Sequence, residues 1–353
     1  MSFWYPALGN GENMNLAGQR VLIFGGTGSL GKAMIRRLAL HNELAIFSRD
    51  EAKHWTIKNK LPVDTDVSFY VGDIRDMNRV REVCRKVSPS VIVIASALKQ
   101  VDTCELSPYE SIQTNTLGIR NVCEVTVDIA ASLPTLHTVL LVSTDKACAP
   151  TNVYGMSKAL AERIVTSYRS ENSKVKYIAI RYGNVLESRG SIIPLFKHQI
   201  EVRTPLTVTD IRMTRFIMTL DQSVNLIEHS IHHAEEGQIW IPKIPAMNII
   251  DLAKIFATRF DSTIQITGMR PGEKLHEDLI SYPESIRARE LSNHFVLEPP
   301  WTAEIQNGEL FEYKSNRDLL VESDLENYLD SLGVFEMRLD DFLGHEIDEI
   351  RRG

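Results

Sequence analysis

The chain has 353 residues, 43% of them hydrophobic, which is enough for one large two-part domain or for two domains with their own cores. The net charge of -7, with no compensating basic run, argues against a general nucleic-acid binder. No apolar run approaches the length that spans a bilayer, and no signal peptide is visible at Met1. We therefore expect a soluble, cytoplasmic protein with no membrane or nucleic-acid partner.

The cysteines indicate no redox or metal chemistry. Cys84, Cys104, Cys123 and Cys148 lack CxxC spacing, so neither a zinc site nor a disulfide framework is predicted, and we expect no bound metal. Cys148 lies near the candidate active segment described below. It is either a nucleophile or, as we expect, a buried small residue.

A glycine-rich turn follows the first predicted strand. The apolar run 20–24 leads directly into the pattern GxxGxxG, and an amphipathic helix follows from Lys32 to Leu40. Three such glycines permit a tight turn, the close approach of backbone to a pyrophosphate, and close packing of helix on strand, whereas the alternative is a merely flexible loop. We expect this turn to bind a dinucleotide through Gly25, Thr27, Gly28, Ser29, Leu30 and Gly31.

The second predicted strand, 44–47, ends in Ser48-Arg49-Asp50. An acidic residue at this place bonds the ribose hydroxyls of NAD, whereas an arginine holds the extra phosphate of NADP. Because Ser48 and Arg49 come first, NADP is predicted, with Lys53 as a further contact. The alternative is that Arg49 only solvates a turn and Asp50 reads the ribose of NAD.

The first half of the chain alternates strands and helices. Further strands are predicted at 67–71, 91–95, 138–142 and 176–180, with a long helix at 108–131. Such alternation predicts an α/β fold, a doubly wound parallel sheet with ligands at the carboxyl ends of its strands. Asp73 follows the third strand, where it either accepts a bond from an adenine amino group or caps the next helix.

The segment after the fifth strand combines an acid and a base with a hydride-transfer pair. Thr144, Asp145 and Lys146 follow the strand directly, and Tyr154 and Lys158 are spaced i, i+4 at the head of a helical run, so both lie on one face. A lysine so placed stabilises a tyrosinate that removes a hydroxyl proton while a nicotinamide takes the hydride. The alternatives are an exposed helix face and a surface loop with a helix-capping acid.

The second half of the chain is less regular and predicts a smaller, interleaved substrate-binding part. The predicted nucleotide-binding domain covers 17–182, with 211–243 returning to it, and the predicted substrate-binding part covers 183–210 and 244–330. Residues 1–16 form an N-terminal extension and 331–353 a C-terminal helical tail.

Together these motifs identify a family resemblance. The chain from about Gln19 to Leu320 resembles the extended short-chain dehydrogenases/reductases with a Rossmann fold. It is most similar to the soluble UDP-N-acetylglucosamine 4,6-dehydratases that invert C5, of the polysaccharide biosynthesis protein family. The resemblance is carried by GGTGSLG, SRDE, GDIRD, ASALKQV, STDKA, YGMSK, RYGNV, SRGSIIP, TDIRMTRF, IPKIP and RPGEKLHE.

The resemblance implies a tightly bound, recycled NADP and a role for each catalytic residue. Tyr154 would deprotonate the C4 hydroxyl, Lys146 would take the C5 proton, and Asp145 would protonate the departing C6 hydroxyl. For Lys146 this requires a pKa lowered by burial and by nearby cations. The family with retention at C5 carries Asp-Glu where this chain has Asp145-Lys146, and simple 4-epimerases lack this couple.

The resemblance also implies binding residues and a homo-oligomer between a dimer and a hexamer. Further cofactor contacts would be Ile74, Ala95, Ala97 and Lys99. For Arg212, as for Arg215, a salt-bridge role competes with a ligand role. The implied contacts to UDP-N-acetylglucosamine are Lys99, Asn115, Asn184, Arg189, Ile192, Thr209, Arg212, Arg270 and Glu273.

Small departures and other functions stay open at this stage. Asp102 and Glu187 stand where relatives commonly have proline and glycine, and both flank the expected pocket. An amino-sugar 4-epimerase would share Tyr154 and NADP but release no water. A C5-retaining dehydratase and a non-catalytic nucleotide-binding scaffold on the same fold are further alternatives.

Overall fold

The computed structural model describes residues 16–168, 175–186, 188, 190–301 and 309–336, which form two compact units. The first unit comprises Met1–Tyr182, Asp221–Lys243 and Ile280–Phe311, and the second comprises Gly183–Leu220, Ile244–Leu279 and Glu312–Gly353. Nearly all of the predicted N-terminal extension and most of the C-terminal tail lie outside the described residues. Within those residues, no helix combines the length and apolar character that crossing a membrane requires.

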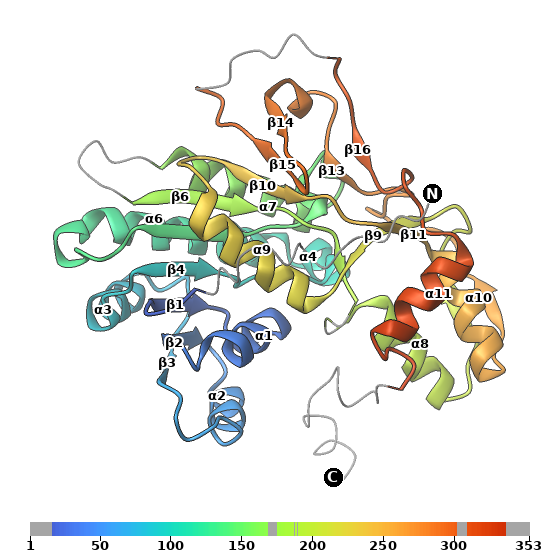
Figure 1. Cartoon of the computed structure of the whole chain (residues 1–353), viewed down its shortest axis with the longest axis horizontal. Coiled ribbons are helices and arrows are strands. Elements are labelled where there is room, and N and C mark those ends of the chain that lie inside the picture. The colour runs from blue at the N-terminus through green and yellow to red at the C-terminus, as the bar shows by residue number, and fades with distance from the viewer. Residues whose placement is uncertain (1–15, 169–174, 187, 189, 302–308, 337–353) are drawn as a thin grey trace. The chain divides into compact units, whose positions relative to one another are not determined.

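The first unit is built on a nine-stranded sheet, as described residues show, in the order β14-β15-β10-β6-β5-β4-β1-β2-β3 (Figure 1). The pairs from β3 to β10 are parallel, and β2 and β3 lie beside β1 while β4 lies on its other side. This order confirms the predicted doubly wound sheet. Its first six strands are β1 (Arg20–Phe24), β2 (Glu43–Ser48), β3 (Val67–Val71), β4 (Val91–Ile94), β5 (Thr138–Val142) and β6 (Lys176–Ile180).

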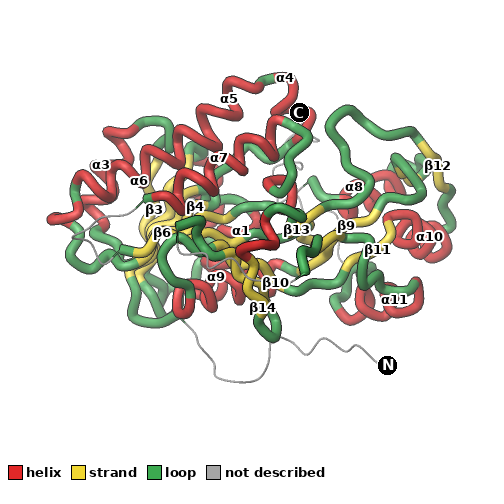
Figure 2. The backbone as a smooth tube through the Cα atoms, turned by 90° about the horizontal axis from the view of Figure 1, so that it is seen from above, coloured by secondary structure: helices red, strands yellow, loops and turns green. Residues whose placement is uncertain are grey.

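Helices cover both faces of this sheet. Figure 2 shows α3, α6 and α7 along one face and α1 and α9 along the other. Their buried residues recur with helical spacing, as with Val80, Val83, Cys84 and Val87 of α3, so each helix turns an apolar stripe to the strands. These helices are α1 (Ser29–Leu38), α3 (Met77–Val87), α6 (Gly118–Asp128), α7 (Val153–Ser167) and α9 (Leu220–His233), and the shorter α2 spans Glu51–Lys58.

The helix predicted at 108–131 contains a wide turn. Helix α5 (Pro108–Ile112) passes into a π-helical turn at Gln113–Leu117 and then into α6, and a 3-10 turn follows at Ala130–Ser132. A short helix, α4 (Val101–Leu106), precedes α5. A π turn inserts one residue into the helical ladder and often marks a functional region. Here it carries Asn115, whose contacts are described below.

Three late strands extend the sheet beyond β6. They are β10 (Ile239–Pro242), β15 (His294–Leu297) and β14 (Ala288–Glu290). Strand β10 pairs in parallel with β6, and β15 pairs antiparallel with both β10 and β14. Because of these ladders, Ile280–Phe311 belongs to the first unit, although the sequence analysis assigned it to the substrate-binding part.

In the part of the chain that the structure describes, the second unit contains small sheets and three helices around its own core. Residues 211–220 belong here rather than to the nucleotide-binding part, because β9 pairs with β7 and β11. The strands are β7 (Asn184–Val185), β8 (Leu206–Val208), β9 (Thr214–Met218), β11 (Ala246–Asn248), β12 (Ile264–Ile266), β13 (Asp278–Ile280) and β16 (Tyr313–Lys314), and the helices are α8 (Ile192–Glu201), α10 (Ile249–Phe260) and α11 (Glu322–Ser331). Buried side chains that join these elements include Phe196, Leu206, Met247, Phe256 and Leu325.

A buried ionic cluster holds the end of β6 in the first unit. Arg181 is 1% exposed and donates to both carboxylate oxygens of Glu162 on α7, at 3.0 and 2.6 Å. It also donates to both oxygens of Glu284, at 2.9 Å each, in the 3-10 turn Glu284–Arg287. The Cys148 thiol donates to Glu284 at 3.2 Å, as expected of a buried cysteine. The cluster therefore ties α7, β6 and the 280–311 segment together.

We expect acid to destabilise the first unit through His294. This imidazole is 5% exposed and stacks on His229, with ring centroids 4.9 Å apart, beside Trp240. Burial, His229 and Lys243 lower its pKa from 6.5 to about 4, so the folded chain holds it neutral where the unfolded chain is protonated. Stability should therefore fall, by up to about 3 kcal/mol, as pH drops from 6.5 to 4. Urea unfolding across this range measures the loss.

The matched variants are His294→Gln and His41→Gln. The first should flatten the loss of stability between pH 6.5 and 4, because it removes the buried titrating group. His41 is exposed, so the second should leave the pH dependence of the wild type. An equally steep loss in His294→Gln would contradict the assignment.

Candidate active site

The turn after β1 is shaped to let a ligand approach the backbone. Gly25 has φ +83°, and a Cβ added there would meet the backbone nitrogen of Ser96 at 2.7 Å. A Cβ on Gly31 would meet the Gly26 carbonyl oxygen at 2.2 Å, so α1 packs directly on the turn. A Cβ on Gly28 would have only the Gly25 oxygen near it, at 3.4 Å. At Gly25 and Gly31 the absence of a side chain allows close packing within the protein. At Gly28 it leaves space at the start of α1 for a ligand to approach the backbone.

The polar residues Arg49 and Asp50, which follow β2, have different contacts. Asp50 caps α2 by accepting a bond from the Lys53 amide at 3.0 Å, and its other oxygen pairs with the Lys53 ammonium at 2.6 Å. This pair, led by the Lys53 hydrogen bond, lowers the pKa of Asp50. Arg49 keeps 56% of its side chain exposed and lies 3.8 Å from Asp73. Asp50 is therefore occupied as a helix cap, and Arg49 is the more available of the two.

The residues after β3 and β4 lie at the same edge of the sheet. Asp73 accepts bonds from the Arg75 amide and guanidinium at 2.7–2.9 Å, rather than capping α3, whose cap is Asp76. Ile74 is 3% exposed and serves packing beside Gly118. Ala95 and Ala97 are half-buried on the loop after β4. Lys99 is exposed on that same loop.

The acid and base after β5 lie in contact. Thr144 precedes a 3-10 turn at Asp145–Ala147, and its hydroxyl donates to Asp145 Oδ1 at 2.9 Å. Lys146 Nζ donates to the same oxygen at 3.1 Å. Asp145 is 1% exposed, and its amide bonds the Tyr182 carbonyl beyond β6. The turn is thus fixed to the sheet, and it holds a carboxylate and an ammonium together.

Helix α7 packs tightly against this turn. Asn152 caps the helix by accepting a bond from the Gly155 amide at 2.8 Å. A Cβ on Gly155 would meet the Lys146 carbonyl oxygen at 2.2 Å, so only glycine permits this approach. The pKa of Tyr154 rises to about 12, because burial outweighs the opposing effects of Lys146 and Thr144. The charges of Lys146 and Asp145 therefore act on the phenol of Tyr154.

Lys158 is buried on the same helix. Lys158 is 2% exposed, and its Nζ donates to the Val142 carbonyl at 2.7 Å. Burial lowers its pKa to about 8, against the opposing charge of Glu162. In this structure Lys146, rather than Lys158, is the cation that lowers the pKa of Tyr154. The sequence spacing alone had assigned that effect to Lys158.

Asn115 lies in the interior of the first unit. It is fully buried, and its Oδ1 accepts a bond from the Leu98 amide at 2.8 Å. Its Nδ2 donates to the Leu98 carbonyl at 2.9 Å and to Ser157 at 3.1 Å. The side-chain amide of Asn115 is thus used in bonds within the protein. It holds the loop after β4 against α7.

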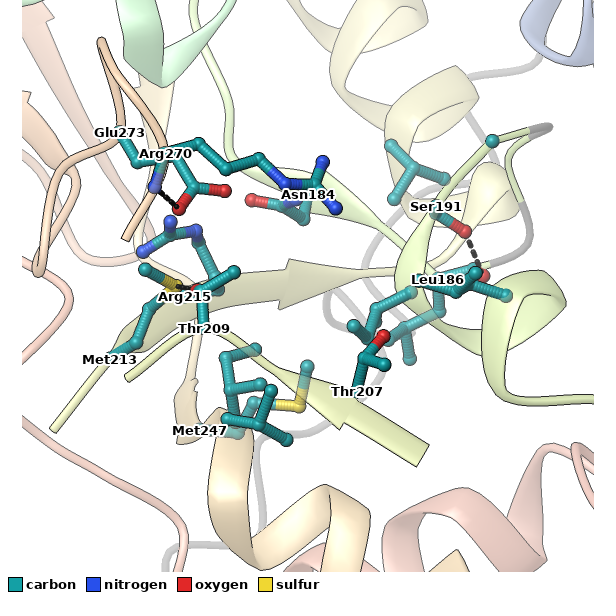
Figure 3. A pocket seen from close by; sticks show the side chains of 16 residues that line it. Asn184, Leu186, Ser191, Thr207, Thr209, Met213, Arg215, Met247, Arg270 and Glu273 are labelled. Atoms are coloured by element: carbon teal, nitrogen blue, oxygen red, sulfur yellow. Dashed lines mark hydrogen bonds between the residues drawn. The ribbon is translucent and has the colours of Figure 1, made fainter. Parts of the chain in front are cut away.

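The second unit contains a pocket of about 870 Å³, including space open to solvent. Figure 3 shows Asn184, Arg215, Arg270 and Glu273 around its upper part, with Met213 and Met247 below them. An apolar floor with a few convergent polar groups is typical of sites that bind small ligands. Its other lining residues are Val185, Leu186, Gly190, Ser191, Ile192, Leu195, Thr207, Val208, Thr209 and Ile249.

Polar groups in this pocket come from loops that are held in place. In the turn at 270–273, Glu273 accepts a bond from the Arg270 amide at 3.0 Å. Arg215 on β9 donates to the carbonyls of Thr214 and Leu275, and it lies 3.8 Å from Glu277. The Oδ1 atom of Asn184 is buried without a hydrogen-bond partner among the described residues. Such a buried acceptor suits a hydrogen-bond donor on a bound ligand.

The pocket brings together five of the predicted substrate contacts, namely Asn184, Ile192, Thr209, Arg270 and Glu273. Arg212 is not among its lining residues; its exposed guanidinium binds both oxygens of Asp210, at 2.9 and 2.7 Å. This pairing lowers the pKa of Asp210 to about 2. Arg189 and Glu187 lie outside the described residues. Lys99 belongs to the first unit.

Sequence reasoning missed the apolar floor of the pocket. Met213 accepts a bond from the Thr209 hydroxyl through its sulfur at 3.3 Å, and Met247 lies on β11. Val208 and Ile249 complete this side. No pattern in the sequence distinguishes such residues from core. The one available signal was the TDIRMTRF segment, which supplies both Met213 and Arg215.

Comparisons with known proteins agree with this fold. The family model described as "Polysaccharide biosynthesis protein" matches residues 21–299. A "UDP-glucose 4-epimerase" of Rickettsia bellii is 40% identical over 285 residues, covering 78% of this chain and 81% of the relative. The "Uncharacterized membrane protein MJ1061" of Methanocaldococcus jannaschii is 37% identical over 292 residues, covering 79% and 85%.

Solved structures are similar as well. Pen from Bacillus thuringiensis superposes with a TM-score of 0.82 at 31% identity, covering 90% of this chain and 99% of Pen. DesIV, a dTDP-glucose 4,6-dehydratase from Streptomyces venezuelae, gives a TM-score of 0.62 at 20% identity, covering 72% and 86%. The latter similarity shows the fold alone.

The fold is therefore a Rossmann-like parallel sheet with smaller C-terminal sheets, the fold also seen in Pen and in solved nucleotide-sugar dehydratase and epimerase structures. Within this class, the chain belongs to the polysaccharide biosynthesis protein family.

Proposed function

We propose that the protein is a UDP-N-acetylglucosamine 4,6-dehydratase that inverts C5, with NADP as its cofactor. The observation that carries this proposal is the contact between Asp145 and Lys146, at 3.1 Å, in the turn that packs against the head of the Tyr154 helix. An acid and a base in contact suit the loss of water from a sugar, which needs one proton removed and one delivered.

The glycine turn and the end of β2 fit NADP. Space over Gly28 at the start of α1 suits a pyrophosphate, and the exposed Arg49 suits a phosphate on the adenosine ribose. When bound, NADP would accept a hydride from the sugar and return it. Asp50 is occupied as the cap of α2, so it is a weaker candidate for reading the ribose hydroxyls of NAD.

The chain's own residues would move the protons. Tyr154 would take the proton of the C4 hydroxyl, and the charge of Lys146 would favour the tyrosinate by opposing the effect of burial on the pKa of Tyr154. Lys146 would next take the C5 proton, while Asp145 would give a proton to the departing C6 hydroxyl. Once the hydride has returned to C6, C5 would take a proton that derives from solvent, on the face opposite to the one that lost it. Lys158 would hold α7 against Val142 and keep its charge close to the cofactor site.

The Asp145–Lys146 pair can supply both the base and the acid that the elimination needs. As an ion pair it holds one proton, on the ammonium. Transfer of that proton across the 3.1 Å contact gives a neutral amine and a carboxylic acid, the forms that the reaction requires. After the amine has taken the C5 proton and the acid has donated its own, the ion pair is restored. The pair therefore needs no proton from solvent for the elimination.

The pocket of the second unit would bind the nucleotide part of the substrate. Arg270 and Arg215 suit a diphosphate, because a guanidinium donates two hydrogen bonds at once. The buried Asn184 oxygen would accept a bond from the ligand, and the floor formed by Met213 and Met247 would pack against a flat base.

We predict that Arg270→Gln raises the dissociation constant of UDP by about 10-fold or more, because it removes a charged donor from the pocket. Calorimetric titration with UDP measures this. Arg212→Gln is the matched control: its guanidinium is paired with Asp210 and does not line the pocket, so the affinity should stay within about twofold. Equal effects of both variants would contradict the placement of the nucleotide.

The reaction itself is tested with UDP-N-acetylglucosamine in heavy water, followed by mass spectrometry and proton NMR. Loss of water, deuterium at C5 and an L-arabino 4-keto product are the expected result. A product isomeric with the substrate, formed without loss of water, would contradict the proposal.

The second candidate is a 4-epimerase, which the names of the 40% identical relatives favour. It would use Tyr154 and the same cofactor but would have no need of the Asp145–Lys146 pair. A C5-retaining dehydratase is set apart by the configuration of the product at C5.

A further inference from the structure

A buried histidine lies directly behind the residue that ends β2. His54 on α2 is 5% exposed, and its Nε2 lies 2.7 Å from the hydroxyl oxygen of Ser48. Thr27 of the glycine turn donates to the same hydroxyl at 3.2 Å. The hydrogen-bonded series Thr27–Ser48–His54 therefore runs from the glycine turn, through the end of β2, to the interior side of α2.

The state of the imidazole decides what Ser48 offers to a ligand. A serine hydroxyl has one proton to donate. When Nε2 of His54 accepts, that proton is directed at the ring and Ser48 has none for a ligand. When Nε2 carries a proton, in the neutral Nε2–H tautomer or in the imidazolium, Ser48 accepts from the ring and its own proton is available to another acceptor. Of these two forms, the imidazolium also adds a positive charge beside the ligand. A phosphate needs donors, whereas a ribose hydroxyl is satisfied by either arrangement.

The surroundings of His54 keep it neutral without a further anion. Burial is the main influence and lowers its pKa, while the charges of Asp50 and Glu51 oppose this. The printed contacts of the ring itself are with uncharged groups, Ser48 of β2 and Phe69 of β3, whose ring centroid is 5.3 Å away. Asp50 is itself paired with Lys53, which weakens its effect. A dianion placed at Ser48 would add the missing charge.

We propose that His54 is a positioning residue for the 2′-phosphate of NADP, taking up a proton when that phosphate binds at Ser48. The imidazolium then donates to Ser48, Ser48 donates to a phosphate oxygen, and the proton comes from solvent. NAD has a hydroxyl in place of the phosphate and draws no proton. This inference rests on the cofactor assignment in the proposed function, and it adds to that assignment a pH-dependent preference between the two coenzymes.

Calorimetry of the full-length chain, stripped of copurified coenzyme, tests this with NADP and NAD in two buffers of different ionisation enthalpy. At pH 7.5 a 2′-phosphate, with a second pKa of about 6, is already a dianion and takes up no proton on its own account. We expect proton uptake with NADP and none with NAD. The affinity for NADP should fall with rising pH, by up to about tenfold per pH unit.

His54→Gln keeps a polar side chain behind Ser48 but removes the titrating ring. It should bind NADP without proton uptake and with an affinity that changes less than about twofold between pH 6.5 and 8.5. His41→Gln, a change at an exposed histidine, should behave as the wild type. Uptake that persists in His54→Gln, or its absence in the wild type, would overturn the inference. This calorimetry contains no sugar, so it is independent of the heavy-water test of the reaction. Water loss in that test without proton uptake here would contradict this inference alone. Proton uptake here without turnover in that test would contradict only the dehydratase assignment.

Discussion

Replacement of Lys146 by methionine should lower the rate of water loss from UDP-N-acetylglucosamine by between about 10²- and 10⁴-fold, the usual contribution of a general base. Methionine keeps the length of the side chain but has no proton-accepting nitrogen. It also leaves Asp145 without the donor that lies 3.1 Å from its Oδ1 atom, so the acid loses its source of a proton. Mass spectrometry of the product, with deuterium incorporation at C5, measures both losses.

Lys243→Met is the matched control for this change. The two lysines have nearly the same side-chain exposure, 20% for Lys146 and 21% for Lys243, and each pairs with a carboxylate, that of Glu290 in the control. Water loss should stay within about twofold in the control, as for surface changes in general. Unchanged turnover in Lys146→Met would remove the base from the mechanism and favour the epimerase.

Arg181→Met should lower the free energy of unfolding by about 3–5 kcal/mol. The arginine is 1% exposed and binds Glu162 and Glu284 through four hydrogen bonds, so its removal takes the arginine away from two carboxylates in the interior and leaves Glu284 with Arg287, 3.9 Å away. Desolvated charges without a partner are among the largest sources of instability in folded proteins. Urea unfolding followed by far-UV circular dichroism measures the change.

The comparison variant is Arg36→Met. Arg36 pairs with Asp221 at 3.1 Å, with both side chains 68% exposed, and surface pairs of this kind contribute at most about 1 kcal/mol. If the two variants lost the same small amount, the buried cluster would not be a stabilising element of the first unit. A loss confined to Arg181→Met supports its role in joining α7 to β6.

The sequence predicted the first six strands well because each is a local apolar run bounded by turn residues. The return of 211–243 to this domain was predicted, and 221–243, with β10, does return, but the strands β15 and β14 beyond β10 were not predicted. Strand β10 pairs with β6, and β15 pairs with β10 in the opposite direction, yet these strands lie far apart in the sequence. Pairing between distant segments leaves no periodic signal, so Ile280–Phe311 was assigned to the wrong part of the fold.

In the candidate site too, residues that are neighbours in the sequence could be predicted, whereas those brought together from distant segments could not. Thr144, Asp145 and Lys146 are neighbours in the sequence, so their proximity followed from one strand and one turn. The pocket collects residues from separate strands and loops, and its methionines have the composition of any core. A buried asparagine that bonds backbone looks the same in sequence as one that bonds a ligand, so the bonds of Asn115 to Leu98 could not be predicted.

The position of β10 in the sheet has a consequence for synthesis on the ribosome. The outer edge of β6 is complete once Ile180 has been made, but its partner begins only at Ile239. At a synthesis rate of about 5–20 residues per second, the backbone groups along that edge of β6 have no strand partner for several seconds. Open strand edges recruit strands from other chains. Nascent chains that stall between these two strands should therefore be the species most prone to aggregate and most dependent on chaperones.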